Sequence, residues 1–119
     1  MASSNVWLPS ASRTATVTSA DIPTVGFKNL TVTLDMTTVG TGSVTLTING
    51  KDAASGKYRL ILAGAAVTTN VTNVYKVTQN VVAAAANVSA IDVLPEFIQL
   101  VATHNNANAA VYSVGYDLI

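Results

Sequence analysis

The sequence predicts an all-β domain, and composition, periodicity and turn chemistry each support that class. Seventeen Val and sixteen Thr dominate the 119 residues, and β-branched side chains favour a pleated, half-buried strand over a helix. Apolar and polar residues alternate with a period of two over several short segments that are separated by Gly-rich or Asn-rich turns. Seven or eight such strands predict a two-sheet antiparallel β-sandwich of the jelly-roll or Ig-like type, or alternatively a small barrel.

Strands are expected in the first half of the chain wherever this alternation is regular. A short strand is expected over residues 14–18. Residues 30–36 and 44–48 alternate apolar and polar side chains on either side of Gly40-Thr41-Gly42, and we interpret them as a hairpin. The polar loop that begins at Asn49-Gly50 leads into a further alternating segment, residues 58–62, which predicts a second hairpin with a longer loop.

The second half of the chain predicts three more strands and one ambiguous segment. Residues 74–79 alternate, and so do residues 97–104 and 111–118, which are separated by the turn-forming run Asn105-Asn106-Ala107-Asn108. In residues 81–92 an alanine run favours helix while Val and Ile favour strand. We expect an extended loop or an irregular strand there.

Residues 1–13 differ from the rest of the chain and are expected to form an extended N-terminal arm, with residues 14–119 as the single folded domain. The arm is Ser-rich, contains Pro9 and holds Trp7, the one tryptophan, between Val6 and Leu8. This apolar triplet has two interpretations: it docks on a neighbouring subunit, or it folds back on its own domain as an edge strand.

Charge and cysteine content limit the classes of partner. Six basic and six acidic side chains give no net charge, which argues against nucleic acid and an anionic membrane as partners. A weakly charged surface favours association, although a monomer covered by Thr, Ser and Asn is the alternative. There is no cysteine, and no apolar run approaches the 18 residues of a membrane span. The N-terminal residues lack the pattern of a signal peptide.

No catalytic or metal-binding constellation stands out, so we expect a protein that is not an enzyme and that has no cofactor. His104, the one histidine, is expected to hydrogen-bond the neighbouring Asn-rich turn, and no G-x-S-x-G elbow accompanies it. Gly40-Thr41-Gly42 is interpreted as a turn and not as a phosphate loop. Four tyrosines could form a sugar-stacking platform, but packing within the sheets is the favoured interpretation: Tyr58, Tyr75, Tyr112 and Tyr116.

Five segments, taken in their order and spacing, resemble the short all-β virion proteins of tailed bacteriophages. These segments are Ser12–Thr18, Gly40–Asp52, Ser55–Tyr58, Asp92–Pro95 and Val111–Tyr116. The resemblance implies a capsid decoration, or cement, protein that binds the assembled head shell and stabilises it, often as a trimer. Its partner would be the major capsid protein, and its location the virion after synthesis in the host cytoplasm.

Two alternatives to decoration remain open, namely a tail or baseplate subunit and a carbohydrate-binding β-sandwich module. For the favoured function, the candidate assembly contacts come from the arm and from the loop after Asn49-Gly50. They are Val6, Trp7, Leu8, Lys51, Asp52 and Lys57.

Overall fold

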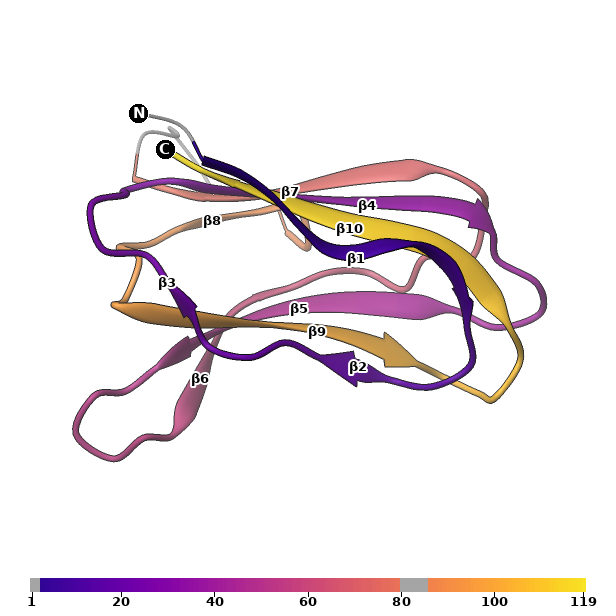
Figure 1. Ribbon diagram of the computed structural model, residues 1–119, viewed down its shortest axis with the longest axis horizontal. Helices are drawn as coiled ribbons and strands as arrows, with labels where there is room; N and C mark the ends of the chain where they lie inside the picture. The colour runs from indigo at the N-terminus through magenta and orange to yellow at the C-terminus, as the bar shows by residue number, and fades with distance from the viewer. Residues whose placement is uncertain (1–2, 80–85) are drawn as a thin grey trace.

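The computed structural model describes residues 3–79 and 86–119, and every regular element in these two ranges is a β-strand (Figure 1). The strands are β1 (Ser3–Arg13), β2 (Val17–Thr18), β3 (Ile22–Pro23), β4 (Leu30–Thr38), β5 (Val44–Lys51), β6 (Tyr58–Ala63), β7 (Thr72–Thr78), β8 (Ser89–Ile91), β9 (Phe97–His104) and β10 (Ala110–Leu118). The all-β class expected from Val and Thr content is therefore confirmed.

The strands form two open sheets that lie face to face (Figure 1). The first, sheet A, has the order β1-β10-β4-β7-β8. The second, sheet B, has the order β2-β9-β5-β6, with β3 also paired to β9. The described pairings are antiparallel except that between β7 and β8, which is parallel.

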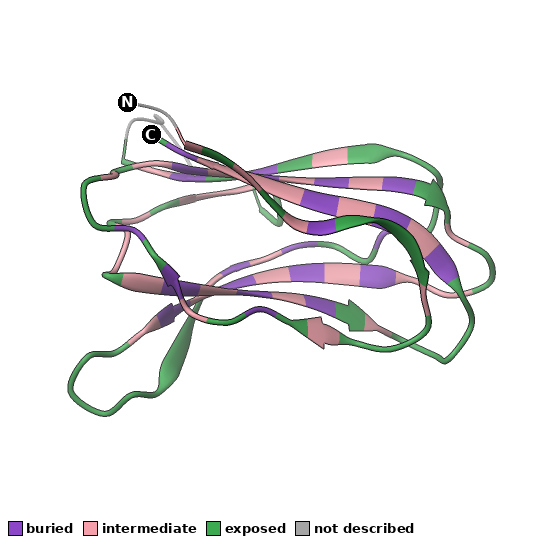
Figure 2. Cartoon of the chain, viewed as in Figure 1, coloured by how far each residue is buried: buried purple, intermediate pink, exposed green. Residues whose placement is uncertain are grey.

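The core lies between the sheets and is built by the alternation seen in the sequence. From Leu30 to Met36 in β4 and throughout β5, every second residue is buried and its neighbours are half-buried, a pattern visible as alternating bands in Figure 2. Burial of these side chains removes apolar surface from water and holds the two sheets together. The largest fully buried side chains come from both sheets: Tyr112, Leu30, Leu34, Met36, Leu46, Ile48, Ile98, Leu100, Val32, Val44, Val77 and Val114.

Four of the antiparallel pairs are nested in the sequence. The first strand pairs with the last, β1 with β10, and the next pair inward is β2 with β9. Then follow β4 with β7 and, innermost, β5 with β6. The chain thus forms the first strand of each of these pairs in turn and then the second strands in the reverse order.

One of the two expected hairpins is confirmed and the other is wrong. β5 and β6 pair antiparallel, as the longer polar loop between them indicated. β4 and β5 do not pair, because β4 belongs to sheet A and β5 to sheet B. The turn at Gly40, which has a φ of +67°, therefore carries the chain from one sheet to the other. A turn signal alone does not distinguish such a crossing from a hairpin.

Residues 3–13 form an edge strand of sheet A, so the described part of the expected arm belongs to a sheet. β1 pairs with β10 along its length, with two register shifts, one between Val6 and Leu8 and one between Leu8 and Ala11. At the second shift, the Arg13 guanidinium donates to the carbonyl oxygens of Pro9 at 2.5 Å and Ala11 at 3.2 Å. It also donates to the Tyr112 carbonyl oxygen at 2.6 Å, which fixes the end of β1 to β10.

The remaining expected strands are present, β9 with the predicted bounds and the others with changed bounds. β7 begins two residues earlier than the predicted 74–79 segment, and β2 covers the last two residues of the predicted 14–18 strand. Of the ambiguous segment 81–92, residues 81–85 lie outside the described ranges, and residues 89–91 form β8.

Candidate functional site

The hairpin between β5 and β6 carries three of the predicted contact residues, and it projects beyond the two sheets (Figure 1). Residues 52–60 are all exposed. The Asp52 carboxylate accepts hydrogen bonds from the Ser55 hydroxyl at 2.6 Å and from the Ser55 amide at 3.1 Å. These bonds lower the pKa of Asp52. The Asp52 amide also donates to the Lys57 carbonyl oxygen at 2.7 Å, so the tip is a closed, internally bonded turn.

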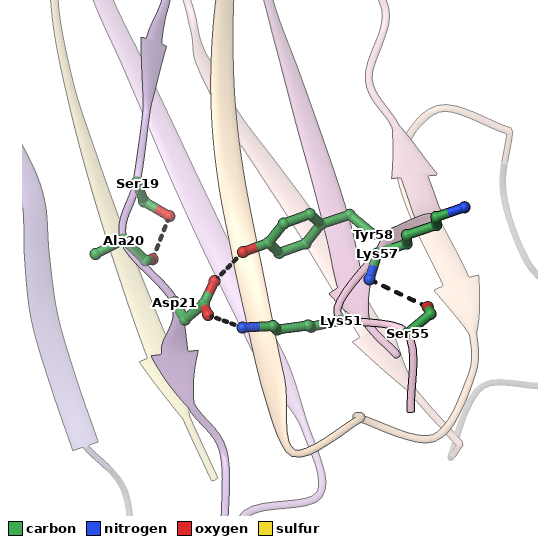
Figure 3. Close-up of polar contacts among 7 residues, drawn as sticks. All are labelled: Ser19, Ala20, Asp21, Lys51, Ser55, Lys57 and Tyr58. Atoms are coloured by element: carbon green, nitrogen blue, oxygen red, sulfur yellow. Dashed lines mark hydrogen bonds and ion pairs between the residues drawn. The ribbon is translucent and has the colours of Figure 1, made fainter. Parts of the chain in front are cut away.

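The base of this hairpin is tied to the link between β2 and β3 by one carboxylate, that of Asp21 (Figure 3). Lys51 Nζ lies 2.7 Å from Asp21 Oδ2, and the Tyr58 hydroxyl donates to Asp21 Oδ1. The hydrogen bond from Lys51, followed by that from Tyr58, lowers the pKa of Asp21. The same bond raises the pKa of Lys51. The three side chains hold the projecting hairpin against the body of the domain.

Sequence reasoning selected Lys51 but missed its two partners. Asp21 has no charged neighbour in the sequence, and Tyr58 was expected to pack within a sheet. The three residues meet because β5 and β6 pair and because the β2–β3 link runs along the neighbouring strand β9. No local sequence pattern encodes a contact that depends on this strand order.

The apolar triplet of β1 is divided by the fold. Val6 is 73% exposed, Trp7 is partly buried against the core, and Leu8 is 8% exposed and part of the core. The sequence predicted all three as assembly contacts. Leu8 offers little surface to a partner, because the register shift after Val6 turns its side chain inward beside Val114. Trp7 remains accessible from one side.

Trp7 lines a surface hollow of about 290 Å³ between the edges of the two sheets. One wall comes from β1 and β10, and the other from the β2–β3 link and β3. Asp21 belongs to this second wall, and the hollow and the hairpin base are therefore neighbours. Its lining residues are Val6, Trp7, Ser19, Ala20, Asp21, Ile22, Pro23 and Tyr116.

A second hollow, of about 310 Å³, lies beside β7, toward the edge of sheet A that is far from β1. Its lining contains no charged side chain. Asn73 contributes to it, and Asn73 Nδ2 is buried without a hydrogen-bond partner among the described residues. This hollow brings together no nucleophile and base.

His104 has a structural contact that the sequence did not predict. Its side chain does not bond the Asn-rich turn; instead Nε2 lies 2.7 Å from the Tyr112 hydroxyl, across the two sheets. Burial, followed by the nearby Arg13 guanidinium, lowers the pKa of His104. The backbone of Ser43 bonds the turn, donating to Asn105 Oδ1 at 2.7 Å.

The tyrosines do not share an exposed surface. Tyr75 and Tyr112 are buried, at 3% and 0% exposure, so neither can stack against a sugar ring. Tyr58 is exposed but holds Asp21, and Tyr116 lines the hollow beside Trp7. Packing within the sheets is therefore confirmed for Tyr75 and Tyr112 and is wrong for Tyr58, and a four-tyrosine platform is excluded.

Within residues 3–79 and 86–119, no group of three or more His, Cys, Asp or Glu side chains is placed to hold a metal ion. Nor does the described structure contain a helix long and apolar enough to cross a membrane. Comparison with known proteins finds no matching family model and no similar curated protein.

Proposed function

We propose that the two sheets form a β-sandwich of the jelly-roll type. A jelly roll is a long antiparallel hairpin rolled up into two four-stranded sheets. If β2 and β3 are counted as one interrupted strand and β8 as an addition, the nested pairs give this pattern. The sheets are then β1-β10-β4-β7 and β2/β3-β9-β5-β6. This strand order supports the jelly roll over the Ig-like alternative, in which no such complete nesting occurs.

On this scaffold, we infer that the chain is a structural subunit of a bacteriophage particle, most simply a capsid decoration protein. The observation that carries the proposal is the projecting hairpin, whose tip is closed by Asp52 and whose base is fixed by Asp21 and Lys51. A rigid protrusion on a compact scaffold suits docking, because little conformational entropy is lost when it binds. The major capsid protein is the proposed partner, and a trimer the proposed oligomer.

The absence of net charge agrees with this function. Subunits that repeat over a symmetric shell gain attachment from many weak contacts, and a neutral surface does not repel neighbouring copies. The chain is not proposed to be an enzyme. The hollow beside Trp7 contains Ser19 and Asp21, but the Ser19 hydroxyl donates to the Ala20 carbonyl oxygen and the Asp21 carboxylate is held by Lys51 and Tyr58.

Binding to purified shells that lack this protein tests the proposal. Lys57 stands at the exposed tip of the hairpin, so Lys57→Glu reverses a charge at the proposed contact without touching the core. We expect wild-type protein to saturate the shells and Lys57→Glu to reduce occupancy several-fold, as measured by co-sedimentation. Lys28→Glu, an exposed loop lysine between β3 and β4, is the matched control and should bind like wild type.

Failure of the wild-type protein to bind any shell would contradict decoration. Labelled antibody on intact virions then distinguishes the remaining structural role, since label on the tail or baseplate would assign the chain there.

A further inference from the structure

The four edges of the two sheets differ in how they are protected against pairing with another strand. An edge strand presents unpaired N–H and C=O groups, and proteins protect such edges with short strands, charges, bulges or proline. In sheet B, β2 and β3 are two residues each, and β6 carries Arg59, paired with Asp92 at 3.1 Å, as well as a register shift. In sheet A, β8 is three residues long.

The remaining edge, β1, is eleven residues long and is protected along only one half. From Leu8 onward it has a second register shift, Pro9 lacks an N–H, and the Pro9 and Ala11 carbonyl oxygens accept from Arg13. The other half, Ser3–Val6, pairs with β10 in unbroken register and presents its outer edge to solvent.

Charge does not protect this half either. There is no charged residue from Ser3 to Ser12. Asn5 Nδ2 donates to the Ser3 carbonyl oxygen at 3.2 Å, a partly buried local bond that involves no charged group. Ser3–Val6 is therefore the one long-strand edge among the described residues that is ready to accept a further strand.

The hollow beside Trp7 lies next to this open edge. A strand added to β1 would run over the gap between the sheets, where Trp7 and Tyr116 form an apolar wall. The carboxylate of Asp21 at the opposite wall is neutralised by Lys51. At about 290 Å³, the hollow is at the lower limit of small-molecule sites and suits one large apolar side chain.

We propose that Ser3–Val6 accepts an extended, uncharged segment of the shell protein as an added strand, with one large apolar side chain of that segment in the Trp7–Tyr116 hollow. This mode of recognition takes affinity from main-chain hydrogen bonds and specificity from the side-chain pocket. It rests on the proposed function, and it names the chemistry of the partner at the β1 edge.

A second copy of this chain fits the same edge less well. The inward-facing residues of the open stretch are Ser3 and Asn5, which pair with Leu118 and Tyr116. A copy that pairs through its own β1 would therefore bring polar side chains over an apolar hollow. The absence of charge permits self-pairing, but the hollow favours a different segment with a bulky apolar residue.

The test uses shell binding and amide hydrogen exchange with three variants. Val6→Lys places a charge on the open edge at a site that is 73% exposed, while Val6→Thr keeps an uncharged, β-branched residue there. Val74→Lys is the matched control. Val6 pairs with Gly115, Gly115 with Thr33 and Thr33 with Val74, so Val74 lies in the same row across sheet A but in β7, away from the open edge. We expect Val6→Lys to lose about tenfold or more in affinity for shells, Val6→Thr to lose clearly less than Val6→Lys, and Val74→Lys to bind like wild type.

Hydrogen exchange supplies the second measurement, because an added strand brings the outward-facing edge amides into hydrogen bonds. The amides of Ser3–Val6 should exchange more slowly in shell-bound than in free wild-type protein. Wild-type affinity in Val6→Lys, or unchanged exchange of these amides, would overturn the inference while leaving decoration intact. Wild-type protein that does not bind shells would overturn both. If the free chain self-associates and Val6→Lys abolishes this, a second copy of the chain binds the Ser3–Val6 edge. That result would also overturn the inference that a shell-protein segment binds there.

Discussion

At the scale of single residues, His104 connects the two sheets. It ends β9 in sheet B, and its Nε2 meets the hydroxyl of the fully buried Tyr112 in sheet A. Arg13 lies over the same ring, with its guanidinium carbon 5.1 Å from the ring centroid. These three side chains close one end of the domain, and the positive charge of Arg13 discourages a second charge on His104.

Acid should therefore weaken the fold through His104. Burial and Arg13 lower its pKa below the ordinary value of 6.5, so the unfolded chain takes up the proton first as the pH falls. The stability that depends on the neutral ring is present above pH 6.5 and is lost as the pH falls through the folded-state pKa. Urea unfolding at about pH 7.5 and about pH 5 should show a decrease for wild type and a smaller one for His104→Gln. An equal decrease in both proteins would contradict this role.

This contact could not be predicted from the sequence. Arg13 and Tyr112 are 99 positions apart, and the His104 side chain finds the hydroxyl only because β9 and β10 lie in different sheets. The strands over residues 30–36 and 97–104 were predicted correctly, because their alternation is local in the sequence. A period of two directly assigns side chains to the two faces of a strand.

At the scale of elements, the β5–β6 hairpin depends on a left-handed residue. Gly56 has a φ of +73°, and no atom lies within 4 Å of the position that a Cβ would occupy. A side chain at this position would therefore destabilise the fold through the left-handed backbone conformation, and not through clashes with neighbouring atoms. The loop was predictable from Asn49-Gly50 and the polar run after it, whereas its projection from the body follows from the ties to Asp21.

Gly56→Ala should lower the free energy of unfolding by about 1–2 kcal/mol, the cost of a left-handed conformation for a residue with a Cβ. Gly56→Asn should lose less, because asparagine tolerates this region better. Urea unfolding curves of the two variants measure the difference. Equal stability of wild type and Gly56→Ala would show that the tip relaxes to another turn.

At the scale of the whole molecule, the nested pairing predicts an order of folding. The β5–β6 pair closes only the short loop between its strands, whereas β1 and β10 join residues from the two ends of the chain, such as Ser3 and Leu118. Loop closure costs more entropy as the loop lengthens, and non-local pairings are slow to form. The innermost pair is therefore expected in the transition state, and the outermost pair after it.

Two leucines of similar burial, one in each pair, test this order. Leu62 in β6 is 6% exposed and Leu8 in β1 is 8% exposed, so truncation of either to alanine should cost about 2–5 kcal/mol. Leu62→Ala should act mainly by slowing folding, because its contacts form early. Leu8→Ala should act mainly by accelerating unfolding, because β1 docks last. Stopped-flow folding and unfolding rates in urea separate the two effects, and a reversed assignment would show that the ends of the chain pair before the hairpin does.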